Sequence, residues 1–134
     1  MMKQTQLGKK ALKVADDFGL KREHDLVMLE LLNSKKIDAI SVLSEYVTND
    51  LAQKLKNIRE ENKALVGLHF NLTSTPSSKT KKVKSILIQS ILGTLDVEEV
   101  QNKLNKQIKE FEIKFNHMPD FIDGLDDSVS LWKL

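Results

Sequence analysis

Short apolar runs alternate along this chain with longer segments that have the periodicity of amphipathic helices. Strands that alternate with helices usually lie parallel and are joined by right-handed crossovers, so this order predicts an α/β fold with a parallel sheet. The predicted strands are Ala11–Ala15, Ile37–Leu43, Ala64–Leu72 and Phe121–Asp123. The predicted helices are Arg22–Asn33, Asn49–Asn62, Ser85–Leu92 and a long one that begins at Asp96 and ends before Pro119.

The run Ala64–Leu72 has the most regular strand pattern. A period of two places the apolar side chains of one face at Val66, Leu68, Phe70 and Leu72. The opposite face carries Leu65, Gly67, His69 and Asn71, so it becomes polar toward the carboxyl end of the strand. The apolar face is expected to pack against helices, which leaves the polar end available for chemistry.

The long helix has recognisable signals at both ends. Asp96, with Glu99 three residues later, resembles a capping box, and Pro119 lies just past the expected end. Its apolar stripe would face the core and consists of Val97, Val100, Leu104, Ile108, Phe111 and Phe115. The preceding stretch, Thr73–Lys84, is predicted to be a solvated loop, although Lys79, Lys81, Lys82 and Lys84 could also steer an anionic partner.

The composition limits the class of protein. A length of 134 residues suits one domain over 1–134, and a net charge of +2 gives no whole-domain signal for nucleic acid. The absence of cysteine excludes a thiolate metal site and a cysteine nucleophile. No segment resembles a signal peptide or is long and apolar enough to span a membrane. We therefore expect a cytoplasmic protein with neither a nucleic-acid nor a membrane partner.

Polar residues collect where the predicted strands end: Asp16 and Asp17 after the first, His69 and Asn71 at the third, and Asp123 at the fourth. In parallel α/β folds, functional residues gather at the carboxyl ends of the strands. A pair of carboxylates there can divide labour, one as a metal ligand and one as a base for a water molecule. The residues alone also fit a plainer interpretation. In that interpretation Asp16 and Asp17 cap a helix, and His69 is a strand histidine with a satisfied hydrogen bond.

Several short motifs in this order resemble the YdjC-like carbohydrate deacetylases, the family of chitooligosaccharide and hopanoid-associated deacetylases. The motifs are Ala15-Asp16-Asp17-Phe18-Gly19-Leu20, Ile37-Asp38-Ala39-Ile40-Ser41, Val66-Gly67-Leu68-His69-Phe70-Asn71-Leu72-Thr73, Lys106-Gln107-Ile108 and Pro119-Asp120-Phe121-Ile122-Asp123-Gly124. The resemblance covers about Val14 to Gly124, which corresponds to the N-terminal half of a family domain.

The resemblance implies a distorted (β/α) barrel, here truncated to about four strands with flanking helices. It also implies metal-dependent hydrolysis of the acetyl group of an N-acetylated sugar. By this pattern Asp16 is the general base, Asp17 and His69 are metal ligands, and the ion is Mg²⁺ or Zn²⁺. The metal would polarise the amide carbonyl while the carboxylate takes a proton from water.

The chain departs from the family after Gly124. Leu125 stands where the family has a further metal-binding histidine, and residues 125–134 form a divergent tail. Asp126 or Asp127 could replace the lost ligand, because carboxylates bind hard divalent ions, but a solvated acidic tail is the simpler interpretation. Val14 also departs from the family's usual asparagine.

These departures lead to three functional hypotheses. The first is a truncated, inactive relative of the deacetylases. The second is a working hydrolase whose site is remodelled, for example across a homodimer, because unpaired strand edges invite pairing with another chain. The third is a non-catalytic module that binds glycans or another protein and is itself dimeric. N-acetylated sugar is the expected small-molecule partner if the chain is active.

Overall fold

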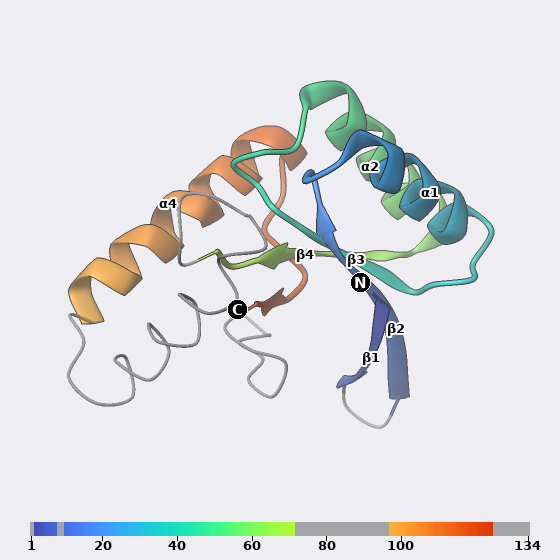
Figure 1. Ribbon diagram of the computed structural model, residues 1–134, viewed down its shortest axis with the longest axis horizontal. Helices are drawn as coiled ribbons and strands as arrows, with labels where there is room; N and C mark the ends of the chain where they lie inside the picture. Colours follow the sequence, from blue (N-terminus) through green and yellow to red (C-terminus); the bar gives the residue numbers. More distant parts are fainter. Residues whose placement is uncertain (1, 8–9, 72–96, 125–134) are drawn as a thin grey trace.

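The computed structural model describes residues 2–7, 10–71 and 97–124 (Figure 1). Within them a sheet has the strand order β1-β2-β3-β4-β5. The strands are β1 (Met2–Leu7), β2 (Lys10–Phe18), β3 (Ala39–Val42), β4 (Leu65–His69) and β5 (Ile122–Asp123). The helices are α1 (Arg22–Asn33), α2 (Asn49–Asn62) and α4 (Val97–Phe115). Strands β2 to β5 are parallel and form a curled half-barrel with flanking helices, in agreement with the predicted fold class.

Strand β1 is the main departure from the predicted elements. It pairs with β2 in antiparallel register, from Met2 opposite Ala15 to Leu7 opposite Lys10. No strand was predicted before Ala11, because this segment has little apolar character. An edge strand gains its stability from backbone hydrogen bonds to one neighbour, and these leave little trace in the side-chain pattern.

The remaining bounds are close to the prediction. Helices α1 and α2 have the predicted bounds, whereas β3 and β4 are shorter than their predicted ranges. β2 runs on to Phe18, so Asp16 and Asp17 lie in the last residues of the strand and not after it. The predicted loop Thr73–Lys84, the predicted helix Ser85–Leu92 and the tail 125–134 lie outside the described residues.

The helices pack on one face of the sheet (Figure 1). That face belongs to the main core, in which Val66, Leu68 and Phe70 of the β4 region meet side chains of α1, α2 and α4. The rings of Phe111 and Phe115 stack there with centroids 4.5 Å apart. The alternation predicted for the apolar face of Ala64–Leu72 therefore holds for Val66, Leu68 and Phe70, whereas Leu72 lies outside the described residues.

The opposite face of the sheet has its own smaller apolar cluster. It is formed by Leu12, Val14, Ala39 and Phe121, with Leu65 packed against them. Gly67 lies beneath the Phe121 ring, and a Cβ at this position would come within 2.5 Å of a ring carbon. These residues occupy alternate positions of successive strands, as do the side-chain layers inside α/β barrels.

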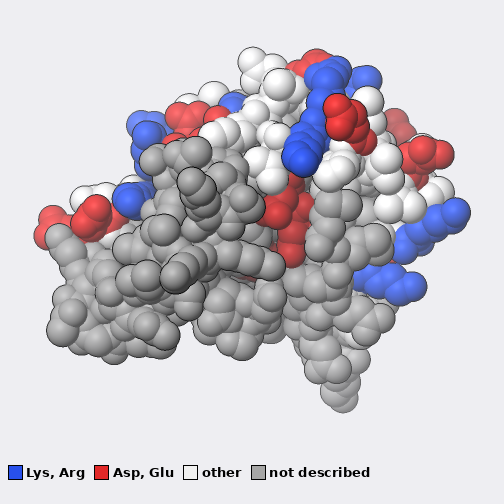
Figure 2. Space-filling model, viewed as in Figure 1, with Lys and Arg blue, Asp and Glu red and all other residues white. Residues whose placement is uncertain are grey.

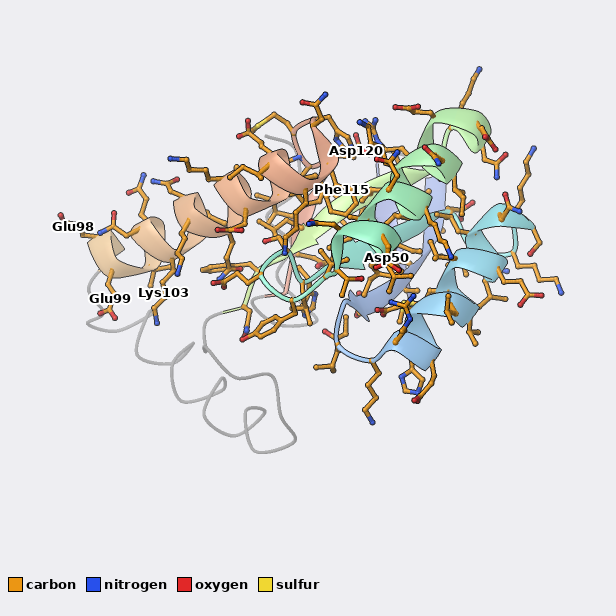
Figure 3. All side chains as sticks on the ribbon, turned by 90° about the horizontal axis from the view of Figure 1, so that it is seen from above. Asp50, Glu98, Glu99, Lys103, Phe115 and Asp120 are labelled. Atoms are coloured by element: carbon orange, nitrogen blue, oxygen red, sulfur yellow. The ribbon has the colours of Figure 1, made fainter. Side chains whose placement is uncertain are left out.

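Asp120 connects the approach to β5 with α2 and β4. Its carboxylate accepts two hydrogen bonds of 2.8 Å from the guanidinium of Arg59 and one of 2.8 Å from the Val66 amide. Burial alone would raise the pKa of Asp120, but the hydrogen bonds from Arg59 and Val66 outweigh it and hold the pKa below its ordinary value. Figure 3 labels Asp120 near Phe115, with Glu98, Glu99 and Lys103 at the distant N-terminal end of α4.

Charged side chains of both signs are scattered over the described part of the face shown in Figure 2. None of the helices in the described part of the chain combines the length and the apolar character that crossing a membrane requires.

Candidate functional site

The face of the sheet opposite the helices changes from apolar to polar along its strands. On β2, Asp16 follows Leu12 and Val14, and on β3, Ser41 follows Ala39. On β4, His69 comes two residues after Gly67, and Asp123 lies beside His69 on β5. Each of these polar residues lies toward the carboxyl end of its strand. Parallel pairing brings those ends to one edge, so the topology itself builds a polar cluster there.

The imidazole of His69 lies between two carboxylates. Its Nε2 atom is 3.1 Å from Oδ1 of Asp17, and its Nδ1 atom is 3.0 Å from Oδ1 of Asp123. The Asp17 side chain is 43% exposed, whereas those of His69 and Asp123 are 10% and 6% exposed. The ring therefore has one side that opens toward solvent and one side that is closed within the protein.

The closed side of the site continues to β3. The Ser41 hydroxyl, which is fully buried, donates a 2.6 Å hydrogen bond to Oδ1 of Asp123. The backbone fixes the same region, because the Phe70 amide donates to the Asp123 carbonyl over 2.8 Å. Gly124 follows with φ +104°, and a Cβ there would lie 2.6 Å from the Phe70 carbonyl oxygen and 3.2 Å from Cε1 of His69. Glycine thus allows β5 to approach the ring closely.

Asp17 reaches the same ring through an irregularity at the end of β2. Simple alternation would point Asp17 away from Asp16, but the pairing register shifts between Ala15 and Phe18, and Asp17 has φ 65°. This is the local geometry of a bulged strand end, which redirects a side chain.

The turn after the bulge is fastened to α1. The Gly19 amide donates a 2.9 Å hydrogen bond to Oδ1 of Asp25, a buried residue of α1. Burial raises the pKa of Asp25, and the hydrogen bond from Gly19 offsets only part of that effect. A Cβ on Gly19 would come within 2.9 Å of the Val47 amide nitrogen, so this turn is tightly enclosed.

The separations among these carboxylate and imidazole ligand atoms fit a bound divalent ion. One ligand atom each of Asp16, His69 and Asp123 lies within 4.8 Å of the others. Ligand atoms sit about 2.0–2.2 Å from a bound zinc ion, so a single ion spans about 4.4 Å between opposite ligands. Asp17 and Nε2 of His69 are also at a separation typical of two ligands on one ion. The mixture of carboxylate oxygen and imidazole nitrogen suits Zn²⁺ and, with more water, Mg²⁺.

The structure brings together the residues that the sequence singled out as base and ligands, namely Asp16, Asp17 and His69. The backbone of Asn71 pairs with the side chain of Gln107. Asp123 was noted only as a strand-end residue, and Ser41 was not singled out. A serine inside an otherwise apolar strand was the available signal for Ser41. Leu125, Asp126 and Asp127 lie outside the described residues.

Comparison with known proteins shows which fold and which protein family this chain shares. The solved structures that resemble the fold include one from Enterococcus faecalis V583, named a "putative cellobiose-phosphate cleavage protein". The match has a TM-score of 0.55 and 22% sequence identity, and it covers 83% of this chain and 46% of that one. The chain thus spans about half the length of that relative, and the likeness shows the shared fold. No curated protein matches the chain. The sequence pattern of the family described as "YdjC-like protein" matches residues 14–126, which include every residue of the polar cluster, and the chain therefore belongs to the YdjC-like family.

Proposed function

We propose that this chain carries the N-terminal part of a metal-dependent carbohydrate deacetylase site, which binds a divalent ion without efficient turnover. The observation that carries the proposal is the convergence of Asp16, Asp17 and His69 at one edge of the sheet. YdjC-like proteins are related to carbohydrate deacetylases, which makes an N-acetylated sugar the substrate class to test.

Each of the three residues has a definite task in this proposal. Asp17 and Nε2 of His69 would hold the ion, because they lie on the solvent-facing side of the ring. A bound Zn²⁺ or Mg²⁺ would polarise the acetamide carbonyl and acidify a water molecule. A carboxylate oxygen of Asp16 lies within 4.8 Å of a ring nitrogen of His69 and would accept the proton of that water.

The proposed lack of turnover rests on Leu125. The resemblance to the deacetylases implies a metal-binding histidine at this position, and a leucine side chain has no lone pair to donate. An ion held by two protein ligands is bound more weakly and is oriented less firmly than an ion held by three.

Zinc titration by calorimetry tests the binding part of the proposal. His69→Ala should lower zinc affinity about tenfold or more, whereas His24→Ala, an exposed histidine on α1, should leave it unchanged. Leu125→His should raise the affinity. Equal zinc binding by the His69→Ala and His24→Ala variants would contradict the site. An unchanged affinity in Leu125→His would contradict the assignment of that position to the missing ligand.

Acetate release from N-acetylated chitooligosaccharides tests the catalytic part. The unmodified chain should release no more acetate with zinc than without it. Metal-dependent release would instead support the working hydrolase with a remodelled site. In that case, equal turnover in Asp16→Asn would show that Asp16 is not the base.

A second candidate is the non-catalytic glycan-binding or interaction module. Among the described strands, β1 and β5 each pair on one side only, and such edges can pair with a second copy. Sedimentation and glycan binding in the presence of a chelator distinguish this candidate. A dimer that binds glycan without metal would favour it over the metal-binding site. The cytoplasmic location expected from the sequence stays a prediction.

A further inference from the structure

We infer that Asp123, held by Ser41, is a positioning residue that fixes the tautomer and orientation of His69. The inference rests on the proposed function, since it assigns a role within the same metal site. The two nitrogens of a neutral imidazole are not equivalent, because one carries the proton and the other offers a lone pair. Which nitrogen carries the proton decides which side of the ring can bind an ion.

The contact at Nδ1 decides this for His69. Oδ1 of Asp123 lies 3.0 Å from Nδ1 and also receives the Ser41 hydroxyl at 2.6 Å. A carboxylate oxygen that already accepts from a hydroxyl acts as an acceptor toward the ring as well. Oδ1 of Asp17 lies 3.1 Å from Nε2 and is an acceptor too, but the Asp17 side chain is 43% exposed and can be solvated by water instead. The Asp123 side chain is only 6% exposed, so the proton of the neutral ring belongs on Nδ1, and Nε2 offers its lone pair on the side of Asp17.

The burial of the two carboxylates separates their roles. An ion and a sugar both arrive from solvent, and the Asp17 side is 43% exposed whereas Asp123 is 6% exposed. An ion placed between Nδ1 and Asp123 would have to displace two short hydrogen bonds in a closed space. Although Asp16, His69 and Asp123 lie close enough to share one ion, this asymmetry places Asp123 outside the coordination sphere.

The backbone makes the positioning rigid. His69 and Asp123 are direct partners in the parallel pairing of β4 and β5, and the Phe70 amide bonds to the Asp123 carbonyl. Gly124 leaves room for Cε1 of the ring, which a side chain there would approach to 3.2 Å. Ser41 reaches Asp123 from β3, so three adjacent strands together define the orientation of one ring.

The tautomer can be measured directly, without metal or substrate. Long-range ¹H–¹⁵N spectra of the ¹⁵N-labelled chain distinguish a protonated from an unprotonated ring nitrogen, and they are recorded at rising pH until the ring signals no longer change. We expect a protonated Nδ1 and an unprotonated Nε2 for His69. A protonated Nε2 would overturn the inference whatever the zinc affinity is.

Variants then test the link to the ion. Asp123→Asn should abolish the preference for protonated Nδ1 and lower zinc affinity about tenfold. Ser41→Ala should leave Nδ1 of His69 protonated and should lower zinc affinity less than Asp123→Asn does. It serves as the second variant if Asp123→Asn does not fold. Asp38→Asn is the matched control, because Asp38 accepts a hydrogen bond from the Lys13 amide far from His69, and it should change neither measurement.

The two measurements separate this inference from the proposed function. An Nδ1-protonated ring in a chain that binds no zinc would support the positioning role and contradict the metal site. Zinc binding that survives Asp123→Asn unchanged, with the same tautomer, would overturn the positioning role and leave the metal site in place.

Discussion

The side-chain amide of Gln107 pairs with the backbone of Asn71 as a neighbouring strand would. Its Oε1 accepts the Asn71 amide at 2.9 Å, and its Nε2 donates to the Asn71 carbonyl at 2.6 Å. Gln107 belongs to α4, and Asn71 lies two residues past the end of β4, which carries His69. The long helix therefore holds the segment that follows the candidate site, through one buried side chain.

Replacing Gln107 with Leu should destabilise the fold by about 2 kcal/mol, because two backbone groups of the buried Asn71 would lose their partner. Urea unfolding followed by circular dichroism measures the change. Gln101→Leu, at an exposed position of the same helix, is the control and should stay within about 0.5 kcal/mol of the unmodified chain. Equal stability of the two variants would show that the pairing with Asn71 contributes nothing.

Replacing Asp120 with Ala should cost about 2 kcal/mol at neutral pH, since Arg59 and the Val66 amide both lose a charged acceptor. The pKa of Asp120 is lowered in the folded state, so its contribution is present above the pKa of the unfolded chain. It is lost as the pH falls through the lower folded value. Urea titrations at several pH values should show the two proteins converging in acid.

Asp50 provides the comparison for Asp120. It also pairs with an arginine, Arg22, over 2.7 Å, but both side chains are more than half exposed. Figure 3 labels both aspartates. Because solvent screens exposed ion pairs, Asp50→Ala should cost clearly less than Asp120→Ala. A larger loss from Asp50→Ala would contradict the importance we assign to burial.

The pH dependence contributed by Asp25 should have the opposite sign. Burial raises its pKa, so its contribution to stability is complete below the pKa of the unfolded chain and is lost as the pH rises through the folded value. Asp25→Asn keeps an oxygen for the Gly19 amide and cannot ionise. The variant should gain stability relative to the unmodified chain as the pH rises above about 4, the ordinary pKa of an aspartate, as measured by urea unfolding at several pH values. A constant difference across these pH values would contradict the prediction.

Gly67→Ala should destabilise the sheet by about 1–3 kcal/mol, because the added Cβ would overlap the Phe121 ring. Phe121→Leu in the same chain should relieve part of this cost. A double-mutant cycle of unfolding free energies measures the coupling between the two positions. Additive changes would mean that the ring moves aside freely when Cβ is added.

The sequence predicted the parts of the fold that depend on local pattern. The bounds of α1 and α2 follow from their apolar periodicity, and the gathering of Asp16, His69 and Asp123 follows from parallel strands ending at one edge. The position of Asp17 beside His69 depends on a bulge and a left-handed backbone, which no spacing rule reveals. The contact of Ser41 with Asp123 joins residues far apart in the chain, so only the tertiary pairing of strands exposes it.

The strand order has a consequence for synthesis. Since β1 to β5 pair in the order in which they occur, each strand can dock on the one made just before it as the chain leaves the ribosome. The contact between His69 and Asp123 nevertheless forms only after β5 has joined the sheet, so the ring is oriented only at that stage. Metal capture by this site would therefore come late and would mark a chain whose β5 has already docked.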